Sequence, residues 1–265
     1  MNIVIAVVSV TIIGVICSCI LSAASKLMYV KIDERIAQLT EIMPGANCGA
    51  CGYPGCSAYA SALAAGETKP NLCTPGGASL LEKISGILGV EAGSIERKIA
   101  LVNCCGDCGS VQKKMEYRGL QSCEAAKQLY AGENACAFGC LGYGDCKIVC
   151  PSGAICVEDN LARIIKELCT GCGLCVKACP NDLISIHNAD IKVHVACKNI
   201  EKGAVTRKKC SSGCIACTKC VKDCPEGAVT MIDNLAVIDY SKCTGGGKCT
   251  EVCITKCFKK VSVKE

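Results

Sequence analysis

The chain has 265 residues and a formal net charge of +5, and it contains 29 Cys but no Trp, two Phe and seven Tyr. So few large side chains cannot fill an ordinary hydrophobic core, and a protein with a thin core relies on disulfides or metal centres. Disulfides are disfavoured because the cysteines come in tight C-x2-C-x2-C runs, whose thiols converge on one centre. Without interleaved aromatic residues or a basic recognition motif, the positive charge does not indicate nucleic-acid binding.

Residues 1–25 carry no charge. A helix of this length, at a rise of about 1.5 Å per residue, spans the roughly 30 Å hydrocarbon core of a membrane. No basic region precedes the apolar run, so a cleaved signal peptide is disfavoured. The first charges are Lys26 and Lys31, and the positive-inside rule then places the following chain in the cytoplasm. We therefore expect a single-pass transmembrane helix in the cell (inner) membrane and a soluble domain on its cytoplasmic side.

The next segment, expected over 32–91, indicates a small α-rich domain built around a C-x2-C-x4-C-x16-C box. The Ala-rich stretch 57–65 predicts a short helix that carries Cys56 near its start. Gly and Pro residues between the cysteines suit a tight loop whose backbone amides face the thiolates. Four thiolates fit one [4Fe–4S] cluster, and a structural zinc ion is the alternative for this box. The four expected ligands are Cys48, Cys51, Cys56 and Cys73.

The rest of the chain contains an internal repeat with an offset of 74 residues, which carries Cys140 onto Cys214. The stretches GAICVEDNLARI (153–164) and GAVTMIDNLAVI (227–238) align at the same offset, and each predicts two short strands joined by an Asp-Asn turn. The other cysteines related by this offset are Cys123 and Cys197, Cys136 and Cys210, Cys146 and Cys220, Cys150 and Cys224, Cys169 and Cys243, Cys175 and Cys249, and Cys179 and Cys253.

Each repeat has the order of elements found in a two-cluster bacterial ferredoxin: a cysteine box, a strand, a turn, a second strand and a second cysteine box. The chain contains this order twice. In that scaffold each box gives three cysteines to its own cluster, while the cysteine before Pro binds the other cluster. We therefore expect an α+β fold with tandem ferredoxin-like units over 129–190 and 191–265, preceded by a connecting segment over 92–128. The complete ligand sets are expected to be Cys150, Cys169, Cys172 and Cys175 in the first unit, and Cys214, Cys217, Cys220 and Cys253 in the second.

Two positions of the repeat lack the expected cysteine, because Tyr143 and Gly246 stand where the aligned repeat has one. In the first unit the set with a substitute ligand is expected to be Cys136, Cys140, Cys146 and Cys179. In the second unit three cysteines remain, and Cys257 is the candidate for the position of Gly246. Without Cys257 this last site holds a [3Fe–4S] cluster, a four-iron cluster with a non-cysteine ligand, or no cluster. The three remaining ligands are Cys224, Cys243 and Cys249.

Several further cysteines have no place in the ferredoxin pattern. Four of them would be enough to bind one additional cluster. However, Cys123 and Cys197 are related by the repeat, which favours a structural role for both of them instead. Cys156 falls in an expected strand and is interpreted as a small buried residue. The cysteines left without an assigned cluster are Cys104, Cys105, Cys108, Cys123, Cys197 and Cys210, and the first four of these form the candidate extra set.

No motif for catalysis or nucleotide binding accompanies these cysteines, since the chain has neither a G-x-G-x-x-G fingerprint nor a G-x-x-x-x-G-K-[ST] loop. We therefore expect a chain that carries electrons and leaves bond-making chemistry to its partners. Three basic runs are interpreted either as a solvated face or as a docking site for an acidic redox carrier such as ferredoxin. The runs are Lys113-Lys114, Arg207-Lys208-Lys209 and Lys259-Lys260.

The uncharged N-terminus and the stretches GANCGACGYPGCSAYASAL and CAFGCLGYGDCKIVCPSGAI together resemble the B subunit of the Rnf electron-transport complex. The resemblance covers essentially the whole chain and is to the longer form with two ferredoxin-like units. It implies a membrane oxidoreductase complex, a translocase that passes electrons between reduced ferredoxin and NAD while pumping Na+ or H+. Within such a complex the B subunit is implied to accept electrons from soluble ferredoxin and to relay them through [4Fe–4S] clusters, about four to five in number, to the other subunits.

Gly246 and Ile254, which stands where a Pro is expected, depart from the family pattern, so the last cluster does not follow from the resemblance. The resemblance also assigns the flavins and the NAD site to sister subunits. Two alternatives remain open at the level of the sequence. One is the electron-feeding ferredoxin-like subunit of a membrane hydrogenase or a carbon-monoxide-oxidising complex. The other is a membrane-tethered zinc or structural cysteine scaffold that recruits partners.

Overall fold

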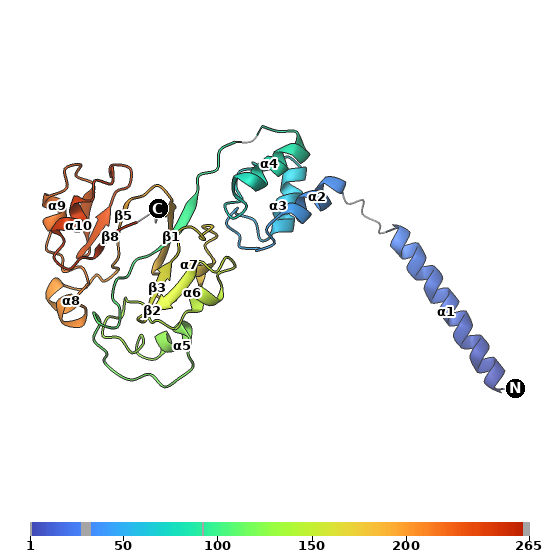
Figure 1. Ribbon diagram of the computed structural model, residues 1–265. Coiled ribbons are helices and arrows are strands. Elements are labelled where there is room, and N and C mark those ends of the chain that lie inside the picture. The colour runs from blue at the N-terminus through green and yellow to red at the C-terminus, as the bar shows by residue number, and fades with distance from the viewer. Residues whose placement is uncertain (1, 28–32, 92, 262–265) are drawn as a thin grey trace.

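The computed structural model describes residues 2–27, 33–91 and 93–261. Met1, Lys31 and the expected boundary positions 32, 92 and 265 lie outside the described residues. From residue 33 onward the chain forms a helical domain followed by two repeat units that contain all the described strands (Figure 1). The observed class is the α+β class expected from the sequence.

The first helix, α1 (Asn2–Leu27), coincides with the uncharged segment. Its described large apolar side chains are exposed, for example Val10 at 69% and Ile20 at 62%. Among the residues that the structure describes, no helix combines the length and the hydropathy of a membrane span. The transmembrane helix therefore stays a prediction from the sequence.

Residues 33–91 form the N-terminal cysteine domain, whose three helices pack around an apolar core of their own. The side chain of Asp33 caps the first of them by accepting the Arg35 N–H at 2.9 Å. Leu39, Tyr59 and Ile84 are fully buried between the helices. One helix begins at Cys56, as the Ala-rich stretch predicted. The helices are α2 (Glu34–Ile42), α3 (Cys56–Ala64) and α4 (Gly77–Leu88).

The first repeat unit contains two short antiparallel sheets, formed by its outer strands and by its inner strands. In the outer pair Ala100 lies opposite Ile186, and in the inner pair Ile155 lies opposite Ile164. The segment expected to be a connector therefore contributes a strand to this unit. The elements are β1 (Lys98–Val102), α6 (Asp145–Ile148), β2 (Ile155–Glu158), β3 (Leu161–Ile164), α7 (Leu174–Ala178) and β4 (Ile184–Asn188).

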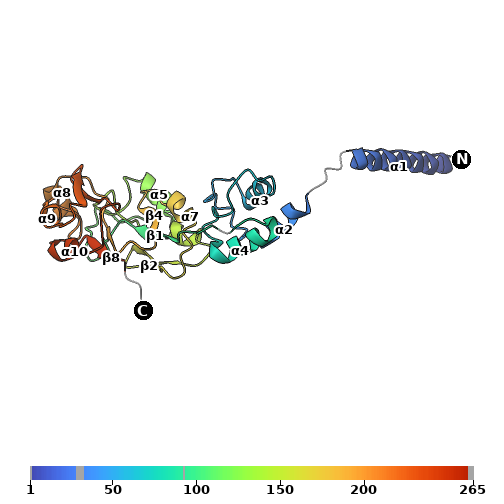
Figure 2. The ribbon, with the colours of Figure 1, turned by 90° about the horizontal axis from the view of Figure 1, so that it is seen from above.

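The second repeat unit has the same order and the same pairing, with β5 against β8 and β6 against β7. The two units lie side by side in both views, with the N-terminal cysteine domain next to the first (Figure 1 and Figure 2). Two further helices, α5 (Cys123–Gln128) and α8 (Gly203–Lys209), each precede the first cysteine box of a unit. The elements of the second unit are β5 (Val193–Val195), α9 (Lys219–Lys222), β6 (Val229–Ile232), β7 (Leu235–Ile238), α10 (Lys248–Val252) and β8 (Phe258–Lys260).

The Asp-Asn pairs form the hairpin turns predicted from the repeat. Asp159 and Asn160 have φ values of 52° and 58°, and Asp233 and Asn234 have 46° and 63°. A two-residue hairpin turn requires positive φ at both central residues, which Asp and Asn tolerate better than most side chains. The turns place the two cysteine boxes of each unit at the same end of its inner hairpin.

Thiols take up much of the interior of both repeat units. In the first unit Cys146 and Cys175 pack with the buried aliphatic residues Ile155 and Ile184. In the second unit the buried residues around Phe258 include Cys214 and Cys220, which are repeat-related cysteines, and Cys257. A core of this composition contains few large apolar side chains, in line with the composition of the chain.

Candidate metal centres

Site A lies in the N-terminal cysteine domain and contains the four predicted cysteines. Cys48 and Cys73 are buried. Burial raises the pKa of Cys73, and the nearby Cys51, Cys56 and Cys48 raise it further. Cys51 and Cys56 pack against the same buried core as Cys73. Asn47 accepts the N–H of Cys56 at 2.8 Å and so fixes the start of α3 against the loop. The structure brings this set together as predicted: Cys48, Cys51, Cys56 and Cys73.

Site B lies in the first repeat unit, where four predicted ligands line one pocket with about 300 Å³ of space between protein atoms. Two of the sulfurs accept backbone N–H groups, Cys169 from Ala100 and Cys150 from Ala154, each at 3.3 Å. Burial, together with the charges of neighbouring thiolates, raises the pKa of Cys175 to about 12. The lining cysteines are Cys150, Cys169, Cys172 and Cys175.

Site C is the second pocket of the first repeat unit and contains about 420 Å³ of space between protein atoms. Cys123 lines it, whereas Cys136, expected here from the sequence, lines a different pocket. Burial and the charges of the Cys140 and Cys123 thiolates raise the pKa of Cys146 to about 12. The lining cysteines are Cys123, Cys140, Cys146 and Cys179.

A network around one carboxylate explains why Cys123 takes the place predicted for Cys136. Asp145, at the start of α6, accepts the backbone N–H of Cys123 at 2.9 Å and that of Glu124 at 3.1 Å. The same carboxylate accepts the hydroxyl of Ser122, the N-cap residue of α5, at 3.0 Å. The start of α5 is thereby held against α6, which carries Cys146. Two features of the sequence could have pointed to Cys123 as the ligand: the cysteine missing at position 143, and the repeat relation of Cys123 to Cys197.

Site D lies in the second repeat unit, in a pocket with about 290 Å³ of space between protein atoms. Cys257 lines the same pocket, with its sulfur 3.5 Å from that of Cys253. The Cys257 thiol lowers the pKa of Cys253 to about 5, because its single S–H can stabilise the Cys253 thiolate as a hydrogen-bond donor. Cys257 therefore does not stand at the position of Gly246. The predicted ligands in this pocket are Cys214, Cys217, Cys220 and Cys253.

Site E consists of the three remaining cysteines of the second unit. Burial and the neighbouring thiolate charges, chiefly that of Cys243, raise the pKa of Cys249 to about 11. A carboxylate oxygen of Glu226 lies 3.7 Å from the sulfur of Cys224. The other carboxylate oxygen of Glu226 lies 3.8 Å from the position that a Cβ at Gly246 would take. The cysteines of site E are Cys224, Cys243 and Cys249.

Replacing Gly246 by Cys is expected to complete the ligand set of site E. The substitution fits, because the backbone of Gly246 lies outside the left-handed region and the added Cβ would approach no heavy atom closer than 3.8 Å. Iron analysis should show a gain of about one ion per chain over a [3Fe–4S] site, or about four over an empty one. Gly246→Ser is the size-matched control and should leave the iron content unchanged. An equal gain in both variants, or none with Cys, would contradict the three-cysteine assignment.

The donor set of these sites fits iron–sulfur clusters. Thiolates are soft ligands that favour iron–sulfur cores, and backbone N–H groups turned toward the sulfurs are the contacts that tune such clusters. Ligation replaces the proton of each buried thiol, so binding offsets the cost of placing a thiolate there. Within the described residues, no three His, Cys, Asp or Glu side chains are placed as ligands of one metal ion.

Several other cysteines lie outside sites A to E. Cys17, Cys19 and Cys108 are exposed. Cys156 lies in β2 and is half-buried rather than fully buried. The remaining cysteines line a pocket between the two repeat units, here named the interunit pocket, and Cys108 of the candidate extra set is not among them. Its lining cysteines are Cys104, Cys105, Cys136, Cys197 and Cys210.

Two family models match the chain, one described as "Putative Fe-S cluster" over residues 43–75 and one as "4Fe-4S binding domain" over residues 162–185. The first range contains all of site A. The second range contains the box at 169–180, which gives three cysteines to site B and Cys179 to site C. Both matches support iron–sulfur clusters in this chain.

Curated relatives include the B subunit of the Na(+)-translocating ferredoxin:NAD(+) oxidoreductase complex of Acetobacterium woodii, 40% identical over 239 residues, which is 90% of this chain and 72% of the relative. The B subunit of the proton-translocating ferredoxin:NAD(+) oxidoreductase complex of Clostridium ljungdahlii is 40% identical over 93% of this chain and 87% of its own length. The B subunit of an ion-translocating oxidoreductase complex of Methanosarcina acetivorans is 34% identical over 89% of this chain and 90% of its own length.

Proposed function

Because the chain belongs to the family of B subunits of ion-translocating oxidoreductase complexes, the Rnf family, we propose that it relays electrons within such a complex as an iron–sulfur subunit. Its ligands are the cysteines of sites A to E. A bound cluster takes up and releases one electron at a time. The protein holds the thiolates, directs N–H groups at their sulfurs and excludes water from the pockets.

The observation that carries the proposal is that neighbouring cysteine sites lie in direct structural contact. Lys177, in the helix that also holds Cys175 of site B, donates a hydrogen bond from Nζ to the carbonyl oxygen of Cys48 in site A at 3.1 Å. Cys146 of site C and Cys175 of site B belong to one buried cluster of side chains. The proposed path therefore runs from site A to site B and on to site C.

We assign the role of electron donor to reduced ferredoxin and that of electron acceptor to the other subunits of the complex. Two relatives carry ferredoxin:NAD(+) oxidoreductase in their names, one with Na(+) and one with the proton as the translocated ion. Each transfer oxidises the donor by one electron, reduces the accepting cluster by one electron and makes no bond. The described chain thus contributes to the oxidoreductase activity without a bond-making active site of its own.

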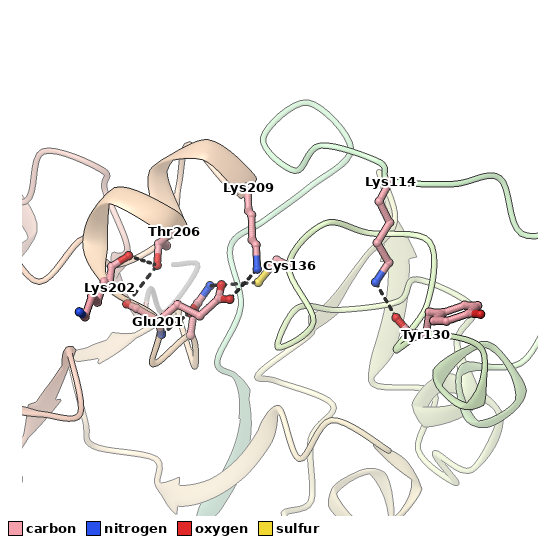
Figure 3. Close-up of polar contacts among 8 residues, drawn as sticks. Lys114, Tyr130, Cys136, Glu201, Lys202, Thr206 and Lys209 are labelled. Carbon is pink, nitrogen blue, oxygen red and sulfur yellow. Dashed lines mark hydrogen bonds and ion pairs between the residues drawn. The ribbon is translucent and has the colours of Figure 1, made fainter.

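The basic runs give limited support to ferredoxin docking, because several of their lysines interact with other residues of this chain. Lys113 pairs with Glu133 at 3.1 Å, and Lys114 donates to the carbonyl oxygen of Tyr130 (Figure 3). Lys209 pairs with the carboxylate of Glu201 in the same view (Figure 3). These contacts favour a structural role for the three lysines over a free docking surface.

We also propose that residues 1–25 anchor the subunit in the cell membrane as a single span, with the cysteine-rich part on the cytoplasmic side. The absence of charge in this segment and the exposed apolar side chains along α1 support the anchor. The names of the relatives, which are subunits of ion-translocating complexes, agree with a membrane location.

A variant that lacks residues 1–25 tests the anchor and the relay together. Expressed anaerobically, it should leave the membrane fraction and stay in the soluble fraction, because the apolar segment is gone. It should keep iron and acid-labile sulfide in equal amounts, about four of each per occupied four-iron site. Reduced ferredoxin should bleach its visible absorption, and EPR should show reduced clusters. The full chain serves as the control for fractionation. A variant free of iron would contradict the relay, and one that stays in the membrane would contradict the anchor.

A further inference from the structure

We propose that the interunit pocket binds an additional [4Fe–4S] cluster through Cys104, Cys136, Cys197 and Cys210, and that this cluster connects the two repeat units into one electron path. The inference rests on the relay function proposed above and extends it. None of the four cysteines belongs to sites A to E. They come from three separate segments of the chain, which the tertiary structure brings together.

The interunit pocket resembles the cluster pockets of the repeat units in size and lining. It contains about 320 Å³ of space between protein atoms, against about 300 Å³ at site B and about 290 Å³ at site D. Cys136 and Cys210 are each only 6% exposed. Small residues leave the space open, since a Cβ at Gly106 would lie 2.5 Å from Val111 and 3.3 Å from the sulfur of Cys210.

Hydrogen bonds to the sulfurs follow the same pattern as in sites B and C. Cys104 accepts the backbone N–H of Cys140 at 3.4 Å, and Cys197 accepts that of Cys214 at 3.2 Å. At Cys136 the donor is the side-chain amide of Asn199, at 3.5 Å. N–H groups directed at sulfur stabilise thiolates and tune the clusters they hold.

The position of Asn199 is itself fixed by its surroundings. Asn199 is 2% exposed, and its side-chain oxygen accepts the backbone N–H of Glu201 at 2.7 Å. The Glu201 carboxylate pairs with Lys209 at the end of α8, and the Thr206 hydroxyl donates to the Glu201 carbonyl oxygen (Figure 3). Figure 3 shows Cys136 beside this network. The amide is therefore preorganised to donate to the sulfur of Cys136.

Five cysteines line the pocket, but a [4Fe–4S] cluster needs only four ligands. The hydrogen bonds indicate which cysteine is not a ligand. The sulfur of Cys105 lies 3.2 Å from the carbonyl oxygen of Ser212, and among the described residues no N–H is directed at it. The sulfur of Cys104, one residue earlier, only accepts, from Cys140 at 3.4 Å. In site B the sulfurs of Cys169 and Cys150 accept backbone N–H groups, and Cys104 shares this pattern whereas Cys105 does not. The four-ligand set therefore contains Cys104 and excludes Cys105.

The pocket lies where the electron path would otherwise be interrupted. Gly139 lines both the interunit pocket and site C, and Cys140 of site C donates its N–H to the sulfur of Cys104. On the other side, Cys214 of site D donates its N–H to the sulfur of Cys197. One electron would leave the reduced cluster of site C, reduce the interunit cluster and pass to site D, with each donor oxidised by one electron.

The test compares two variants of the full chain that differ at adjacent cysteines, each prepared anaerobically with iron and sulfide supplied. Cys104→Ala should lose about four iron and four sulfide ions per chain relative to wild type, and EPR should show one reduced cluster fewer. Cys105→Ala, which removes a thiol of equal size from the same pocket, should keep the wild-type content. Cys210→Ala should lose the same four ions, and the Cys104→Ala/Cys210→Ala double variant should lose no more than either single variant.

The outcomes separate this inference from the proposed function. Wild-type protein without iron and sulfide would overturn the relay itself. Iron-loaded wild type with an unchanged content in both Cys104→Ala and Cys210→Ala would overturn only the interunit cluster, leaving those thiols as buried packing. Equal losses in Cys104→Ala and Cys105→Ala would overturn the ligand assignment, as would zinc in place of the missing iron. Iron content and EPR amplitude are read on the folded chain, so they do not depend on activity of the complex.

Discussion

Removing the iron from the purified chain is expected to unfold both repeat units while much of the N-terminal cysteine domain keeps its helices. The sheets of the repeat units have two strands each, and isolated two-stranded sheets are marginally stable in water. Their interiors are lined by thiols such as Cys146, Cys175, Cys214 and Cys220, which bury little apolar area. Ligation of those thiols therefore supplies a large share of the folding free energy.

The measurement is circular dichroism and calorimetry on the anaerobic chain before and after chelation of its iron under reducing conditions. The strand signal and the cooperative thermal transition should disappear, and both should return when iron and sulfide are added back. The N-terminal cysteine domain is the internal control, because Leu39, Tyr59, Leu80 and Ile84 give it a core of large apolar side chains in which Cys73 is one member among many. A chain that keeps its strand signal and its transition without iron would contradict the prediction.

Replacing Cys123 by Ala is expected to remove the cluster of site C and to interrupt transfer between the two halves of the chain. About four iron and four sulfide ions per chain should be lost, because Cys123 lines the pocket in place of the cysteine missing at position 143. Reduction of the second repeat unit by electrons that enter at site A should slow by orders of magnitude. The loss is checked by iron and sulfide analysis and by rapid-mixing absorption after addition of reduced ferredoxin.

Two further variants sharpen this prediction. Cys156→Ala is the matched control, since Cys156 lies in β2, its sulfur lies 3.8 Å from the carbonyl oxygen of Arg163, and it lines none of the pockets of sites B, C and D. Its iron content should equal that of wild type. Adding Tyr143→Cys to Cys123→Ala should restore part of the lost iron, because residue 143 occupies the repeat position of Cys217. Full iron in Cys123→Ala, or a loss in Cys156→Ala of the same size, would refute the role of Cys123.

The order and the type of the elements were largely determined by the sequence. The repeat offset predicted two similar units, and the Asp-Asn pairs predicted their hairpin turns, because few residues adopt two consecutive positive φ values. The three cysteines of the run at 169, 172 and 175 were assigned to one site, which the structure gathers in one pocket. Residues two or three positions apart cannot separate far, so their spacing alone brings their sulfurs together.

The distant ligands depend on tertiary contacts that spacing does not encode. Cys123 reaches site C because Asp145 holds the start of α5 against α6, and Cys136 is consequently left for the interunit pocket. Cys257 lies beside Cys253 because β8, which follows it, pairs with β5 rather than extending toward Gly246. The sequence by itself thus predicted that thiolates would surround iron–sulfur cores. It also predicted which cysteines close together in the sequence would bind the same core. Only the packing of helices and strands from separate segments decided which remote cysteine completes each set.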